Sequence, residues 1–169
     1  MRHLLLLATL FFTFSVVAAQ QHSEWQTVRS VADGFSVEMP GTPKISTEDM
    51  GNGATQKNFV VEVGGETYLA SVIQLAKGRG PGTPDETYFA TLMKGYTEGS
   101  TTTLRSSRMI TWAGHTAMEG IADAAPAVHL VDITAVGDRI YLVVFGGSKG
   151  QENGTKARRM RDTFKLLGN

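Results

Sequence analysis

Most of the chain alternates between apolar and polar residues with the period of a β-strand. The first clear case runs through residues 25–39, where Phe35, Val37 and Met39 place three apolar side chains on one face. The intervening Ala-Asp-Gly is a turn sequence, so this segment predicts a β-hairpin. Pro40 ends the second strand because proline cannot donate a hydrogen bond to a neighbouring strand.

The same alternation continues on both sides of one helical segment. Residues 57–76 predict two strands around a Gly-Gly turn, and residues 101–147 predict four more strands separated by short turns. Such short connections favour antiparallel neighbours over parallel crossovers. The polar segment 45–56 predicts a loop or a loosely held edge strand.

Two segments change to the helical period. Thr83 and Glu86 complete a capping box with proline between them, and the apolar residues that follow predict a helix over about residues 83–97. A second helix is predicted over about residues 154–167. Its apolar stripe consists of Ala157, Met160, Phe164 and Leu167. Strands, helix, strands and helix in this order predict an α+β domain around a mainly antiparallel sheet.

The first residues follow a different pattern. Arg2 precedes an apolar run over residues 4–17, and small residues follow up to Ala19. This order is typical of a secretory signal peptide, whereas an uncleaved membrane anchor needs a longer apolar run of ~20 residues. We therefore expect a signal peptide at residues 1–19 and a single soluble domain at residues 20–169, without stable membrane insertion and located in the periplasm or secreted.

The amino-acid composition excludes several kinds of chemistry for this domain. The chain has no cysteine, which excludes disulfides, thiol catalysis, zinc-thiolate sites and the lipid anchor of a bacterial lipoprotein. Its formal net charge is +0, so no overall field favours nucleic acid or an anionic membrane. We expect no nucleic-acid partner and no cofactor.

Several segments together resemble one known superfamily. The opening WQTVRSVADGFSVEMPGTPK is similar to the start of PsbP-like domains, and the resemblance continues in PGTPDETYFATLM, ITWAGHTAMEGIAD, RIYLVVF and RDTFKLL. It implies an α/β/α sandwich with a central antiparallel sheet. Members include the extrinsic photosystem II subunit, a Ran-binding import factor and the envelope lipoprotein DcrB. The resemblance therefore implies a non-enzymatic accessory or binding protein, and it supplies no site residues.

One motif suggests hydrolysis. Residues 146–150 fit G-x-S-x-G, with Ser148 in the nucleophile position after a predicted strand and before a predicted helix. A hydrolase of that type needs a histidine later in the chain, but none follows Ser148. We therefore favour a flexible connector at this position and predict that the protein is not an enzyme.

A second hypothesis is a small-ligand or metal carrier that uses a polar sheet face. Alternation places His115, Glu119 and Asp123 on one face of a strand, and His129 on the next strand approaches them if the two form a hairpin. The strand spreads His115 and Asp123 over about 27 Å, so one ion contacts only part of the set. A solvated sheet face is the simpler interpretation, and we assign no metal site.

The densest basic run lies on the second predicted helix, at Lys156, Arg158, Arg159 and Arg161. These residues go round the helix, which favours a solvated face; the alternative is a surface for an acidic partner or anionic head groups. The sequence thus predicts an exported accessory or binding protein with a protein partner in the cell envelope, whose identity the residues do not name.

Overall fold

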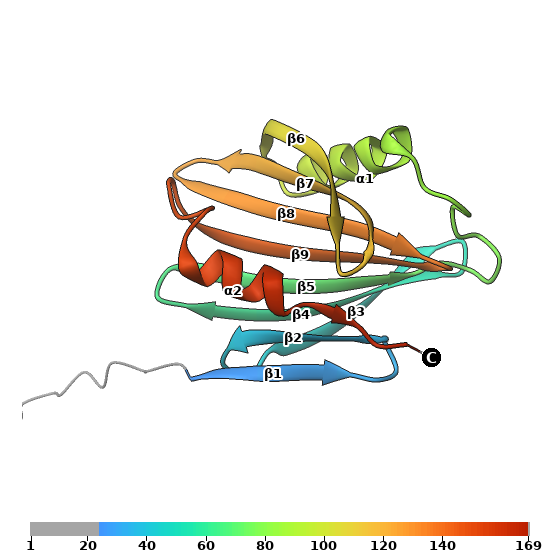
Figure 1. Ribbon diagram of the computed structural model, residues 1–169, viewed down its shortest axis with the longest axis horizontal. Helices are drawn as coiled ribbons and strands as arrows, with labels where there is room; N and C mark the ends of the chain where they lie inside the picture. Colours follow the sequence, from blue (N-terminus) through green and yellow to red (C-terminus); the bar gives the residue numbers. More distant parts are fainter. Residues whose placement is uncertain (1–23, 169) are drawn as a thin grey trace, which may run out of the picture.

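The computed structural model describes residues 24–168, so the predicted signal segment lies outside the described residues. These residues form ten strands and two helices (Figure 1). The strands are β1 (Trp25–Ser30), β2 (Phe35–Pro40), β3 (Lys44–Gly51), β4 (Ala54–Val63), β5 (Glu66–Gln74), β6 (Thr103–Trp112), β7 (His115–Ala124), β8 (Ala127–Val136), β9 (Arg139–Ser148) and β10 (Lys165–Leu166), and the helices are α1 (Glu86–Gly99) and α2 (Thr155–Thr163).

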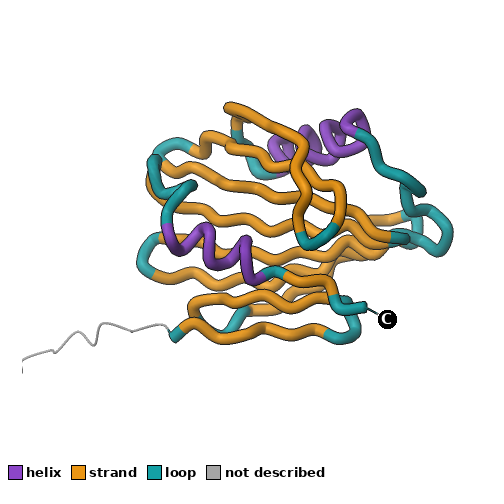
Figure 2. The backbone as a smooth tube through the Cα atoms, viewed as in Figure 1, coloured by secondary structure: helices purple, strands orange, loops and turns teal. Residues whose placement is uncertain are grey.

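Seven strands form the central sheet in the order β3-β4-β5-β9-β8-β7-β6. Every neighbouring pair is antiparallel, as the short connections predict. The other three strands form a small sheet in the order β1-β2-β10. Figure 2 shows this small sheet beside the large one, with α2 crossing one face of the large sheet and α1 lying behind it.

The two faces of the central sheet carry separate cores. On the face covered by α2 and the small sheet, Phe164 stacks on Trp112, with ring centroids 4.4 Å apart, and also stacks on Phe35. On the opposite face, Phe89 and Met93 of α1 pack on β7, β8 and β9. We call these the α2 face and the α1 face. The predicted α+β sandwich is confirmed, with the three-stranded sheet sharing the α2 layer.

The start of the first helix differs from the prediction. Asp85, not Thr83, is the N-cap, and its carboxylate accepts a hydrogen bond of 2.8 Å from the Tyr88 backbone N–H. Since Asp85 has extended backbone angles, the helix begins only at Glu86 and then continues to Gly99. The capping-box prediction therefore placed the helix start too early.

The second helix is shorter than predicted. It stops at Thr163 because Phe164 leaves the helix to enter the core of the α2 face. The next two residues pair with β2 as strand β10, with Leu166 opposite Phe35. Backbone pairing in a sheet thus replaces the last predicted helical turn, and Leu167 does not continue the apolar stripe.

The polar segment 45–56 forms strand β3 and the beginning of β4. All eight residues of β3 are exposed, and β3 is an edge strand of the central sheet. A turn at Asn52 and Gly53, both with positive φ, connects the two strands. Of the two predicted alternatives, the edge strand is confirmed.

Within residues 24–168, no helix is long and apolar enough to cross a membrane.

Candidate functional site

The polar sheet face that the sequence suggests is divided between the two sides of the sheet. In the β7–β8 hairpin, Glu119 is opposite Asp132, whereas His129 is opposite Ala122. Paired residues share a face, so Glu119 and His115 lie on the α2 side and His129 lies on the α1 side. The prediction that His129 approaches His115 and Glu119 is therefore wrong. No group of metal-ligating side chains in residues 24–168 is arranged to hold an ion.

His129 connects α1 to the sheet. Its Nδ1 lies 2.7 Å from the Tyr96 hydroxyl, and the two rings are tilted against each other. Burial lowers the pKa of His129, because a charged imidazolium is poorly solvated there. Burial also raises the pKa of Tyr96 to about 12. This contact positions the helix.

Glu119 and Asp132 form an ion cluster beneath α2. Arg161 contacts both carboxylates, and Arg108 donates to Glu119 at 2.7 Å. Asp132 is only 1% exposed, and its Oδ1 has no hydrogen-bond partner. Burial raises the pKa of Asp132 to about 7; the Arg161 charge opposes this shift and the Glu119 charge adds to it.

The basic run on α2 binds carboxylates of the same chain. Lys156 contacts Glu66 of β5 at 2.8 Å, and Arg159 contacts Glu38 of β2 at 2.7 Å. The Arg159 guanidinium also lies over the ring of Trp25, 4.6 Å from its centroid. Arg161 belongs to the ion cluster, which leaves Arg158 as the exposed member with no ion pair among the described residues. Most of the predicted contact surface therefore anchors α2.

Ser148 lies at the exposed end of β9. Its backbone N–H donates to the Gln151 side chain at 2.9 Å, while no described residue forms a hydrogen bond with its hydroxyl. The nearest histidine across the β8–β9 ladder is His129, whose Nδ1 is occupied by Tyr96. The motif forms the end of β9 and the turn after it, so it lies where the chain passes from β9 to α2.

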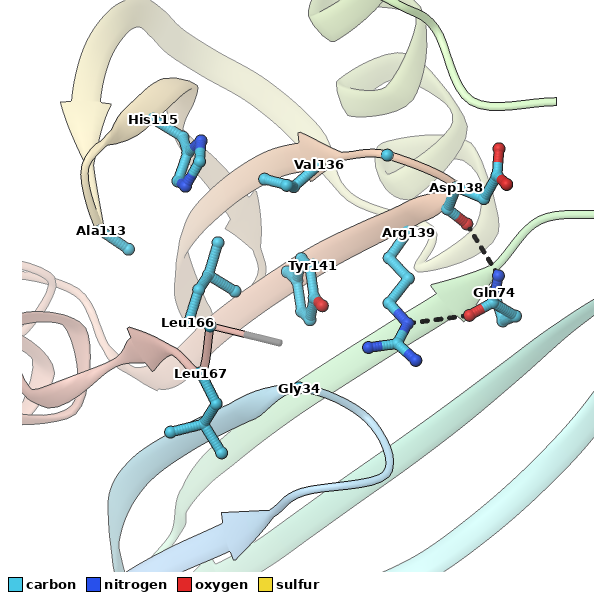
Figure 3. A pocket seen from close by; sticks show the side chains of 12 residues that line it. Gly34, Gln74, Ala113, His115, Val136, Asp138, Arg139, Tyr141, Leu166 and Leu167 are labelled. Atoms are coloured by element: carbon cyan, nitrogen blue, oxygen red, sulfur yellow. Dashed lines mark hydrogen bonds between the residues drawn. The ribbon is translucent and has the colours of Figure 1, made fainter. Parts of the chain in front are cut away.

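A hollow of about 600 Å³ lies at the end of the sheet where β5 ends and β9 begins (Figure 3). Apart from His115, its polar side chains are already bonded to the chain. Arg139 donates to the Gln74 side chain at 2.9 Å and to the Ala32 carbonyl at 3.0 Å, and the Tyr141 hydroxyl donates to the Asp33 carbonyl. These bonds hold the β1–β2 turn against the sheet.

Gly34 explains how that turn approaches so closely. Its φ is +74°, and a Cβ atom there would lie 2.6 Å from Arg139 Nη1. His115 lies on the rim of this end hollow, away from Arg139 (Figure 3). The contacts in the end hollow therefore attach the β1–β2 turn to β9.

A second concavity, of about 580 Å³, lies on the α1 face. We call it the α1 groove. Its lining is mostly apolar and comes from five elements that are distant in the sequence. These residues are Glu48 and Met50 of β3, Gln56 of β4, Leu69, Ser71 and Ile73 of β5, Ile140 and Leu142 of β9, and Thr91, Leu92, Gly95, Tyr96 and Gly99 of α1 with the adjacent Ser100.

The α1 groove exists because α1 covers only part of its face. The helix contacts β6, β7 and β8, whereas β3, β4 and β5 extend beyond it. Leu69, Ile73 and Leu92 are therefore only partly buried, and Met50 is 51% exposed. A concave, mainly apolar surface with a few polar groups has the usual construction of a ligand site.

Sequence reasoning did not find the α1 groove. Its floor residues follow the ordinary pattern of a buried strand, and only assembly of the sheet brings them beside α1. The available signal was Gly95, a glycine inside an otherwise regular helix that continues to Gly99.

Comparison with known proteins gives the fold. No protein-family model and no curated protein sequence matches the chain. The solution structure of cyanobacterial PsbP (CyanoP) from Synechocystis matches 92% of this chain and 99% of that chain, with a TM-score of 0.55 and 12% identity. The chain has a PsbP-like fold. A crystal structure from Bacteroides thetaiotaomicron matches 80% of this chain and 46% of that chain, with a TM-score of 0.37 and 15% identity.

The PsbP-like fold agrees with the resemblance carried by the opening segment and by the hairpin of β6 and β7. At 12% identity, the likeness concerns architecture and does not transfer an activity. Function must therefore be argued from this chain's own surfaces.

Proposed function

We propose that this protein is an exported, non-enzymatic accessory protein of the cell envelope, and that it works by holding a binding partner with an apolar surface in the α1 groove. The α1 groove carries the proposal: it is the mainly apolar concavity among those described above, and its wall and floor are partly exposed. Burying such surface stabilises a complex by about 25 cal/mol per Å² of apolar area.

The polar clusters support a binding protein over an enzyme. The carboxylates under α2 pair with Arg108 and Arg161, and His129 bonds to Tyr96. Arg139 and Tyr141 hold a turn. These side chains have roles in the fold, whereas Leu69, Ile73 and Met50 gain contacts only if another molecule covers them.

The signal pattern at residues 1–19 supports export to the periplasm or the medium. We retain the carrier hypothesis with a different site and a different ligand. Its ligand site moves from His115, Glu119 and His129 to the α1 groove, and its ligand changes from a metal ion or polar small molecule to a molecule with an apolar body.

The test compares a groove-filling variant with a matched control. In Gly95→Leu the new side chain has open space and enters the α1 groove. In Ala90→Leu the same leucine side chain is introduced at an exposed position of α1 that does not line the groove. Each tagged mature chain is recovered from the native envelope fraction, and bound species are quantified by native mass spectrometry and proteomics.

We expect wild type and Ala90→Leu to retain the same species and Gly95→Leu to lose it. Equal retention by all three proteins would contradict the proposed site. A hydrolytic activity that disappears in Ser148→Ala would contradict the non-enzymatic function.

A further inference from the structure

Gly95, in the interior of α1, has no explanation within the folded domain, and Gly99 follows it at the last position of the helix. Gly95 and Gly99 lie in the helix, and neither has a positive φ. Beyond the neighbouring residues and the backbone of the helix itself, a Cβ atom at either position would find no atom within 4 Å. Glycine in the interior of a helix lowers stability relative to alanine, so the domain alone would be more stable with a side chain at position 95.

Both glycines face the α1 groove. Together with Thr91 they repeat every four residues, which places them in one row along the helix. At 1.5 Å of rise per residue, the row is about 12 Å long. Small side chains along such a row keep a narrow strip of helix surface accessible, which suits an elongated occupant that lies along α1.

The opposite wall of the groove offers hydrogen-bond acceptors. Glu48 is the charged residue of the lining, and it forms no ion pair with any residue in the described part of the chain. Gln56 donates its Nε2 to Asn58 and Ser71, so its Oε1 is left to accept. A positively charged donor is complementary to this wall, and an anion is repelled by it.

We propose that the α1 groove binds a single hydrocarbon chain that carries an ammonium head group. The chain lies along the row of Thr91, Gly95 and Gly99, over Leu69 and Ile73, and the ammonium donates to Glu48. This inference rests on the proposed function, because it names the chemical class of the molecule that the same groove holds.

The experiment uses three probes with the same chain and different head groups: decylamine, decanol and decanoate. Each is titrated below its aggregation concentration into the mature chain, and binding is followed by calorimetry. We expect decylamine to bind roughly tenfold more tightly than decanoate, with decanol between them, since Glu48 attracts one head group and repels the other.

Two sets of variants separate the head group from the chain. Glu48→Gln should bring the affinity for decylamine close to that for decanol and leave decanol binding unchanged. Glu62→Gln, which removes an exposed carboxylate of β4 outside the groove, should leave all three affinities unchanged. Gly95→Ala with Gly99→Ala should weaken all three probes while raising the midpoint of thermal unfolding.

The outcomes distinguish the inference from the proposed function. Equal affinities for the three probes, or a preference that survives in Glu48→Gln, would overturn the ammonium ligand and leave groove binding intact. If no probe binds but Gly95→Leu still loses an envelope species, such as a protein, the occupant belongs to another class and the inference is wrong. If no probe binds and Gly95→Leu changes nothing in the envelope recovery, both fail.

Discussion

The two faces of the central sheet are covered in different ways. On the α2 face, α2 is anchored to four strands by charge: Lys156 to β5, Arg159 to β2, and Arg161 to both β7 and β8. On the α1 face, Tyr96 makes the one side-chain hydrogen bond from α1 to the sheet among the described residues. The α2 layer is also widened by the three-stranded sheet, whereas α1 leaves β3 to β5 partly uncovered.

This difference indicates that the two faces of the sheet contribute differently to the stability of the domain. The α2 face has aromatic stacking and buried ion pairs, which are features that fix a unique packing. The α1 face retains accessible apolar side chains and helix glycines, which lower the stability of an isolated domain. Stability is therefore concentrated on one face, and we place binding on the other.

The largest predicted difference between the faces comes from their aromatic residues. Phe35→Ala and Phe164→Ala should each lower the free energy of unfolding by about 3 to 5 kcal/mol, because both side chains are buried in the α2-face core. Leu92→Ala at the partly exposed groove wall should cost only about 1 kcal/mol. Denaturant unfolding measures all three, and losses below about 1 kcal/mol for the phenylalanines would contradict this comparison.

The next effect concerns the anchoring of α2. Arg161→Ala should cost about 2 to 3 kcal/mol, since it leaves Glu119 and Asp132 near each other without their shared cation. Arg158→Ala, on the exposed side of the same helix, should change stability by less than about 0.5 kcal/mol. Equal effects in the same unfolding assay would show that the ion cluster does not hold the helix.

The same cluster predicts a pH dependence. The folded-state pKa of Asp132 is raised to about 7 from the ordinary aspartate value of 3.8, so the folded protein holds one more proton than the unfolded chain between these pH values. The stabilisation from that proton is complete below pH 4 and is lost as the pH rises through 7.

We expect a loss of the order of 1 to 2 kcal/mol between pH 5 and pH 8, after relaxation around the buried charge softens the effect. Unfolding curves across this range should show the slope in wild type and not in Asp132→Asn. A wild-type stability that is flat or rising over the same interval would mean that Asp132 is ionised throughout.

The smallest effect distinguishes two kinds of glycine on the α1 face. Gly95→Ala should stabilise the protein by about 0.5 to 1 kcal/mol, because the new methyl group meets open space. Gly120→Ala should destabilise it by about 1 kcal/mol, because a Cβ atom there would lie 2.5 Å from the buried Met93 side chain. Thermal unfolding gives both signs, and a destabilised Gly95→Ala would remove the argument that Gly95 is kept for a ligand.

Most strands of the central sheet could be predicted from the sequence, because the alternation of apolar and polar residues is a local property. It failed where the outcome depended on partners distant in the chain. Phe164 continues a helical stripe in sequence, but its contact with Trp112 and the pairing of the following residues with β2 end the helix. The local pattern contained no sign of that competition.

The candidate site was harder to predict, because side-chain direction depends on hairpin register. The β7–β8 turn pairs odd-numbered residues with even-numbered ones, which separates His129 from Glu119. Predicting the α1 groove also requires the position of α1 on the sheet. Because α1 lies over β6 to β8, apolar residues of β5 stay accessible. The one departure from local preference in the sequence near this groove is Gly95 in the interior of α1.

Methyl NMR during a decylamine titration tests the central claim most directly, because it reports on both faces in one experiment. We predict saturable shifts at Leu69, Ile73 and Leu92 around the α1 groove, and unchanged resonances at Val37 and Val143 in the core of the α2 face. Saturable shifts centred instead on the α2 face, or on Val136 and Leu166 at the end hollow, would contradict the assignment of binding to the α1 face.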